Sequence, residues 1–291
     1  MAESKIPVDL FNPGQVFACL GFMELADMLL GDAEAGFNWS NPKQARFCLM
    51  ANGDEDPVKA AIGFAAEADL ESVSPSFNEL NTKKWNVHTR ELGRNEAFPF
   101  PLPNSPATLP IELSKDGKVF QVNHWGDGTV RDNVKFWAGA GGYPGAALWR
   151  DALDLVKDRA TAAYEDPFAL SAPQSSSFRF DWRRDYIPLD AGFSPNEHAE
   201  MEMVGYPLVE LFAAVGLNHA RPQRPDRRNK LLYRYSVIGS DARNVGLLPL
   251  PFLRTALGAH AMPFPQRFFR MNLGWPGQEN QARCITTVTE E

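Results

Sequence analysis

The chain has 291 residues, 36 acidic against 29 basic side chains, a net charge of −7 and 44% apolar content. This length allows one large domain or two ordinary ones, and the apolar share excludes global disorder. The acidic sum argues against a protein that coats nucleic acid over its whole surface. The charge is polarised, however, because residues 219–270 hold ten basic side chains and only two acidic ones, Asp226 and Asp241.

The first predicted element is a long apolar helix that starts at Asn12-Pro13 and ends near Gly31. Asn can cap a helix, and proline suits its first turn because the missing N–H would be unpaired there. Gly21 lies inside this helix and indicates close packing at that turn.

The remaining elements follow from apolar periodicity and turn signals. The first half of the chain predicts a strand over 45–51, a helix over 58–68, and a hairpin of strands 109–113 and 119–123 around Asp116-Gly117. The second half predicts a helix over 146–164, a half-buried strand over 178–182, a helix over 195–217 interrupted at Pro207, a strand over 231–238, a helix over 251–260 and a strand over 283–289. This mixed order favours an α+β fold with a mixed or antiparallel sheet packed with several helices.

A proline-rich stretch over 98–110 contains five prolines and is predicted to be an extended connection. It separates a helical or αβ part at 1–97 from an α+β main part at 111–291, with a single integrated domain as the alternative.

Cysteine usage and hydropathy indicate a cytoplasmic, soluble protein. Three cysteines stand far apart without a CxxC pair, and Cys19 and Cys48 have apolar neighbours, which predicts buried free thiols in a reducing compartment. The start of the chain lacks the pattern of a signal peptide, and no stretch is expected to span a bilayer.

The sequence contains no motif of a nucleophilic, metal or phosphate-loop enzyme. The five histidines never stand at metal-ligand spacing, so we expect no metal, no cofactor and no catalytic residue. A glycine-rich run at 137–145 precedes a predicted helix and can either hold a phosphate or form a tight turn without a ligand.

The most informative segment is RPQRPDRRNKLLYR at 221–234, in which six of fourteen residues are basic. Arginine forks suit phosphate, and two prolines keep the first half extended, which predicts an arm along a nucleic-acid backbone. The alternative is a solvated loop paired with the acidic N-terminal third. A second candidate is SSSFRFDWRRDY at 175–186, where aromatics alternate with Arg179 and Arg183. These aromatics serve either base stacking or the core.

Several blocks together resemble one known family. They are IPVDLFNPGQVFACLGFMELADMLL (6–30), NVKFWAGAGG (133–142), FRFDWRRDYIPLDAGFSPNE (178–197), YPLVELFAAVGL (206–217) and LPLP (248–251). In order and spacing they resemble the Csb-type subunits of type I-U (also called I-G) CRISPR systems, in particular the family named Csb three or Csx fourteen.

The resemblance implies a non-catalytic subunit of a Cascade-like surveillance ribonucleoprotein in antiviral defence. It implies ferredoxin-like RNA-binding elements or a large-subunit role, with other effector subunits, guide RNA or target DNA as partners and no membrane. The phosphate contacts would then be Arg221, Arg224, Arg227, Arg228, Lys230 and Arg234, followed by Arg179, Arg183, Lys135 and Trp137. Two alternatives remain: an endoribonuclease that processes guide RNA through His124, His219 or His260, and a scaffold that touches only proteins.

Overall fold

The computed structural model describes residues 1–41, 43–100, 102–125, 143–174, 176–183, 203–242, 246–274 and 284–291. The helices and strands, in chain order, are β1 Ala2–Val8, α1 Pro13–Leu30, β2 Glu34–Asn38, β3 Ala45–Ala51, α2 Pro57–Glu67, β4 Asp69–Ser74, β5 His88–Glu91, β6 Ile111–Lys115, β7 Lys118–Val122, α3 Gly145–Asp154, β8 Ala172–Pro173, β9 Val204–Gly205, α4 Pro207–Gly216, β10 Leu232–Ser240, β11 Leu248–Pro249, α5 Leu250–Leu257, β12 Gln266–Gly274 and β13 Cys284–Glu290. The predicted α+β class is confirmed.

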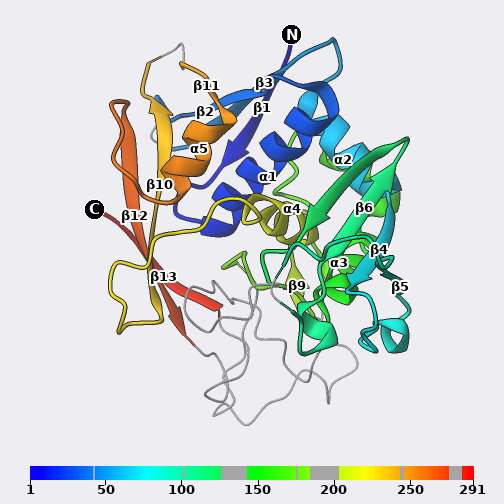
Figure 1. Ribbon diagram of the computed structural model, residues 1–291. Helices are drawn as coiled ribbons and strands as arrows, with labels where there is room; N and C mark the ends of the chain where they lie inside the picture. Colours follow the sequence, from blue (N-terminus) through cyan, green and yellow to red (C-terminus); the bar gives the residue numbers. More distant parts are fainter. Residues whose placement is uncertain are drawn as a thin grey trace.

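The larger sheet has the order β1-β3-β2-β10-β12-β13, with β11 paired to β2 (Figure 1). β3 lies antiparallel between β1 and β2, and α1 connects β1 to β2. The order β1-α1-β2-β3-α2 is the split β-α-β connectivity with which a ferredoxin-like fold begins. The similarity ends after α2, because β4 joins the smaller sheet instead of pairing with β1.

Helix α1 forms the centre of the core, packed against the larger sheet and α4 (Figure 1). Two glycines permit the close approach of α1 and α4. A Cβ on Gly21 would lie 1.9 Å from the carbonyl oxygen of Phe212, and one on Gly216 would lie 2.0 Å from that of Phe17. The close packing predicted at Gly21 is therefore confirmed, since any larger residue there would separate the helices.

Among the described helices, only α1 is long and apolar enough to cross a membrane, although the sequence pattern predicted no such stretch. In the fold, 78% of it is buried. That burial is expected of a core helix in a soluble protein. Cys19 on α1 and Cys48 on β3 are buried thiols, as predicted.

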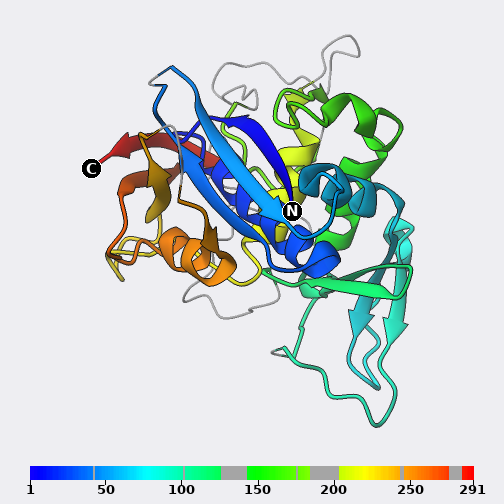
Figure 2. The same ribbon diagram turned by 90° about the horizontal axis from the view of Figure 1, so that it is seen from above.

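The smaller sheet has the order β5-β4-β6-β7 and projects from the main body (Figure 2). β4 precedes the proline-rich connection and β6 follows it, yet the two strands pair antiparallel. β6 and β7 form the predicted hairpin, with positive φ angles of 50° at Asp116 and 76° at Gly117. Two consecutive positive φ angles match the right-handed twist of the strands, which is why Asp-Gly is favoured there.

Two predicted elements differ from the structure. The helix expected to reach Tyr164 ends at Asp154, because Val156 leaves helical geometry at φ −130° and a 3-10 helix follows over Lys157–Ala163. The strand expected over 178–182 is absent, since Arg179 adopts a left-handed conformation with φ 66°. Of the helix expected over 195–217, the structure describes α4 alone.

Candidate nucleic-acid interface

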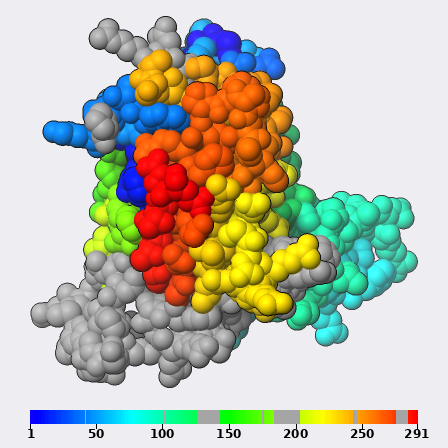
Figure 3. Space-filling view, turned by 90° about the vertical axis from the view of Figure 1, so that its left-hand side faces the viewer, coloured from blue at the N-terminus to red at the C-terminus, as the bar shows by residue number. Residues whose placement is uncertain are grey.

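Residues 221–231, here called the basic loop, connect α4 to β10 and lie on the surface beside β13 (Figure 3). Gln223 and Arg234 exchange two backbone hydrogen bonds of 2.8 Å, which close the loop at its base. Just before the loop, the side chain of Asn218 is bound to the end of β7. Its Oδ1 accepts from the backbone N–H of Asn123 at 2.8 Å, and its Nδ2 donates to the carbonyl of Gln121 at 2.9 Å. The segment is therefore a closed loop and not the extended arm that the sequence predicted.

The tip of the basic loop carries three exposed cations, Arg227, Arg228 and Lys230. Two short turns order the tip. The side chain of Asp226 accepts a 2.8 Å hydrogen bond from the backbone N–H of Arg228, and the side chain of Asn229 accepts one of 3.0 Å from the backbone N–H of Leu231. None of the three cations forms an ion pair with a residue that the structure describes. Their positive charges face solvent on a locally ordered backbone.

At the base of the basic loop, Arg221 and Arg224 are half-buried, and the charge of Arg221 is felt by the buried His124. The imidazole of His124 lies among the rings of Trp125 and Phe180. Burial first, and Arg221 second, lower the pKa of His124 to about 3. His124 is therefore a neutral core residue at neutral pH and cannot reach a 2′-hydroxyl in this conformation, whereas His219 and His260 are exposed.

Arg234 and Arg270 lie directly opposite each other on β10 and β12, and Glu291 binds both. The Arg270–Glu291 ion pair measures 2.7 Å, and the Arg234 guanidinium also stacks over Phe268 at 4.5 Å. Burial acts to raise the pKa of Glu291, but the hydrogen bonds from the two arginines outweigh it and lower that pKa. Like charges opposite each other destabilise a sheet, so Glu291 offsets a repulsion within it.

Two further arginines within residues 219–270, here called the basic quarter, are paired with carboxylates. Arg267 on β12 forms a two-bond pair with Glu290, at 2.6 and 2.7 Å, and this pairing lowers the pKa of Glu290. Arg254 on α5 binds Glu24, a buried carboxylate of α1, with 2.6 Å between Nε and Oε1. Pairing with the acidic N-terminal third is thus seen at Arg254, whereas the strand arginines pair with the carboxylates of residues 290 and 291.

Arg183 makes structural contacts. Its guanidinium binds Asp181 at 2.6 Å, donates to the carbonyl of Phe168 at 2.9 Å, and lies 3.5 Å from the ring centroid of Tyr206. A phosphate would have to compete with all three partners.

Arg179 acts on its neighbours through its backbone. Its left-handed conformation points the N–H groups of Phe180 and Asp181 at the buried carboxylate of Glu210, each at 3.1 Å. Phe178 and Phe180 are fully buried, so the alternative that the aromatics face the core is the correct one. The alternating aromatic and polar residues therefore belong to a bent segment and not to a strand. This segment packs tightly against α1, since a Cβ on Gly14 would lie 2.5 Å from the carbonyl oxygen of Phe180.

Lys135 and Trp137 lie outside the described residues, as does most of the glycine-rich run. Within the described part of the chain, no group of three histidine, cysteine or acidic residues is placed to hold a metal ion.

No protein-family model, curated protein or solved structure matches this chain. The functional interpretation therefore depends on the sequence blocks and on the geometry of the basic loop.

Proposed function

We propose that this chain is a non-catalytic subunit of a type I-U CRISPR surveillance ribonucleoprotein, working in the cytoplasm in antiviral defence. In this proposal it contacts the phosphate backbone of guide RNA or target DNA through the basic loop, while other faces meet neighbouring subunits. The support is the order of the family-like sequence blocks together with the three loop-tip cations, which form no ion pair with a described residue.

The observation that best supports the proposal is the exposure of three cations at the loop tip. Arg227, Arg228 and Lys230 project from a backbone that is already ordered by turns, so binding would cost little further backbone entropy. Each phosphate they neutralise would release counterions from the nucleic acid. Such contacts position a backbone without reading its bases, as expected where guide pairing supplies the specificity.

The test is co-expression of the chain with its operon neighbours, followed by purification through a tag on this chain and extraction of bound nucleic acid. The variant Arg227→Ala/Arg228→Ala/Lys230→Ala should lose most of the bound RNA or DNA. A matched control removes the same charge from three exposed cations beside the smaller sheet: Lys83→Ala/Lys84→Ala/Arg94→Ala. Equal nucleic-acid content in both variants and the wild type would contradict the proposal.

Two other outcomes would replace the proposal. A scaffold subunit would keep its protein partners after nuclease digestion and would contain no protected nucleic acid at the loop. A processing nuclease would cleave a CRISPR repeat RNA at one position, and His219→Ala or His260→Ala would abolish that cleavage.

A further inference from the structure

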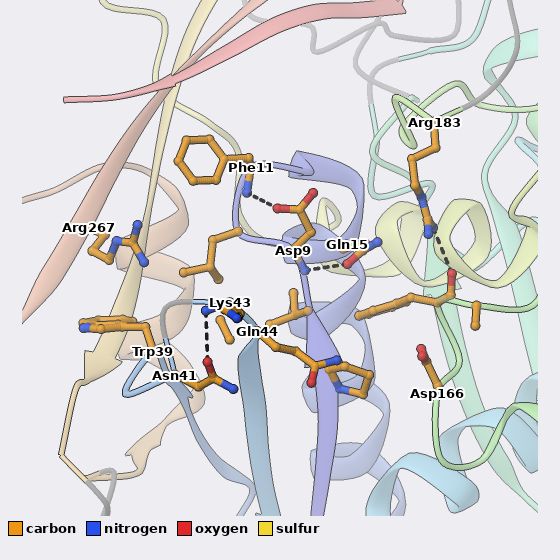
Figure 4. Close-up of a pocket in the computed structure, with 16 residues that line it drawn as sticks. Asp9, Phe11, Gln15, Trp39, Asn41, Lys43, Gln44, Asp166, Arg183 and Arg267 are labelled. Carbon is orange, nitrogen blue, oxygen red and sulfur yellow. Dashed lines mark hydrogen bonds between the residues drawn. The ribbon is translucent and has the colours of Figure 1, made fainter.

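A cavity of about 330 Å³ opens where β1 leads into α1, at the end of the larger sheet. Figure 4 shows Trp39 and Arg267 on one side of it, Asp9 and Gln15 at its centre, and Asp166 on the other side. The volume lies at the small end of the range for ligand pockets and suits one mononucleotide-sized molecule.

Trp39 reaches the cavity because β2 lies very close to β10. Gly239 permits this approach, since a Cβ there would lie 1.8 Å from the carbonyl oxygen of Phe37. The backbone N–H of Trp39 then donates to Ser240 at 3.0 Å, which continues the parallel pairing beyond β2. The indole is half-buried and has the guanidinium of Arg267 5.8 Å from its ring centroid. An indole with a cation at its rim is a good platform for a planar base.

Asp9 and Gln15 provide fixed polar groups at the centre of the cavity. The backbone N–H of Asp9 donates to Oε1 of Gln15 at 2.7 Å, and Oδ1 of Asp9 accepts from the backbone of Phe11 at 2.9 Å. Gln15 is only 4% exposed, yet its Nε2 has no hydrogen-bond partner among the described residues, and neither has Oδ2 of Asp9. One acceptor and one donor group thus remain available in a cavity whose other sides are partly apolar.

Lys43 is the cation of the cavity that has no ion-pair partner among the described residues. Its backbone is held by a 3.0 Å hydrogen bond to Oδ1 of Asn41. Arg183 and Arg267 also line the cavity, but each is bound to a carboxylate outside it. The carboxylate of Asp166 lies at the opposite side, so an anionic group would be directed toward Lys43.

We propose that this cavity binds a nucleotide, with the base stacked on Trp39, its hydrogen-bonding edge at Asp9 and Gln15, and its phosphate near Lys43. Each nucleobase carries hydrogen-bond donors and acceptors at its edge, so an acceptor at Oδ2 of Asp9 and a donor at Nε2 of Gln15 are chemically compatible with any base. In the context of the proposed function, on which this assignment rests, the nucleotide is a base splayed out from a bound single strand. The same chemistry would take a free mononucleotide. The basic loop and the β2–β3 connection are both visible on the face of the molecule that Figure 3 shows.

The experiment measures calorimetric binding of GMP and UMP to the full chain, with ribose 5-phosphate as the ligand that lacks a base. Both nucleotides should bind, Trp39→Leu should weaken them about tenfold, and Trp39→Phe should recover most of the affinity. Gln15→Glu keeps the acceptor for the backbone of Asp9 but removes the donor, and should weaken binding as well. Phe77→Leu, which removes an exposed aromatic ring beside the smaller sheet, is the control and should change nothing.

Three results would overturn the assignment: no binding of either nucleotide, binding of ribose 5-phosphate equal to that of GMP, or Trp39→Leu equal to wild type in affinity. A second arm uses a single-stranded RNA and the same strand with abasic positions. If RNA binds through the basic loop but GMP does not bind and Trp39→Leu has no effect, the cavity assignment fails and the proposed function stands. If GMP binds in a Trp39-dependent way but no RNA binds, the cavity is a free-nucleotide site and the proposed function fails.

Discussion

The basic loop and the β10–β12 ribbon are neighbours in the sequence and both carry arginines, but their charges have different surroundings. On the ribbon, Arg234, Arg267 and Arg270 are bound by Glu290 and Glu291. At the loop tip, Arg227, Arg228 and Lys230 face solvent and form no ion pair with a described residue. The net charge of +8 over residues 219–270 therefore overstates the charge that a phosphate backbone would meet.

The ribbon arginines and the loop-tip cations differ in this way because their charges are held at different spacings. Antiparallel pairing sets Arg234 opposite Arg270, and such closely held like charges require a carboxylate between them. The tip residues are long side chains in water, where screening makes their mutual repulsion small. Ribbon arginines thus stabilise the fold, and tip cations remain available for a ligand.

The largest predicted effect concerns the base of the basic loop, where Arg221 acts on the buried His124. The folded-state pKa of His124, about 3, lies below its unfolded value of about 6.5, so between these values only the unfolded state binds the proton. Its contribution to stability is complete above pH 6.5 and is lost as the pH falls toward 3, by about 1.4 kcal/mol per pH unit. In chemical denaturation, the free energy of unfolding of wild type should fall more steeply than that of His124→Phe as the pH is lowered from 6.5 toward 3. Equal slopes would show that the pKa of His124 is the same in the folded and unfolded states, which contradicts the lowered value.

The next effect is the loss of a structural pair in the basic quarter. Arg254→Met leaves the buried carboxylate of Glu24 without its partner and should lower the free energy of unfolding by about 3 kcal/mol. The double variant Glu24→Met/Arg254→Met should regain most of this stability, because the unpaired buried charge is gone. A loss below about 1 kcal/mol for the single variant would place Arg254 with the surface cations instead.

A smaller effect is expected from releasing the ribbon arginines. Glu290→Gln/Glu291→Gln removes the negative charges that hold Arg234, Arg267 and Arg270, so single-stranded RNA should bind several-fold more tightly. The lowered pKa values of both glutamates give the wild type a stability contribution that is present above about pH 4.3 and is lost as the pH falls through those values. The double variant should lack this step in an acid titration. Unchanged RNA affinity would mean that the ribbon lies outside the interface.

Local signals in the sequence predicted the elements whose geometry is determined by a few neighbouring residues. Asn12-Pro13 marks the start of α1, and Asp116-Gly117 forms the hairpin turn. The strands β1, β2 and β12 were missed because their character comes from distant partners. β1 contains Pro7 and two charged residues, and becomes a strand through pairing with β3, whose paired residues lie 37 to 49 positions further along the chain.

For the candidate site too, the sequence predicted local features and missed those that depend on distant residues. The charge run predicted the cations of the basic loop, because exposure of consecutive charges is a local property. Their sorting into paired and unpaired groups depends on Glu24, Glu290 and Glu291, which only the fold brings to the basic quarter. The cavity had no sequence signal, since Asp9 and Trp39 stand thirty residues apart and line one cavity only because β1 and β2 both pair with β3.

The most direct test of the account is the salt dependence of single-stranded RNA binding to three proteins: wild type, the tip variant Arg227→Ala/Arg228→Ala/Lys230→Ala, and the ribbon variant Arg234→Gln/Arg267→Gln/Arg270→Gln. Loss of three phosphate contacts should reduce the slope of log K against log salt by about 2 in the tip variant. The ribbon variant should keep the wild-type slope, although it is less stable. A wild-type slope in the tip variant, with a reduced slope in the ribbon variant, would contradict the central claim.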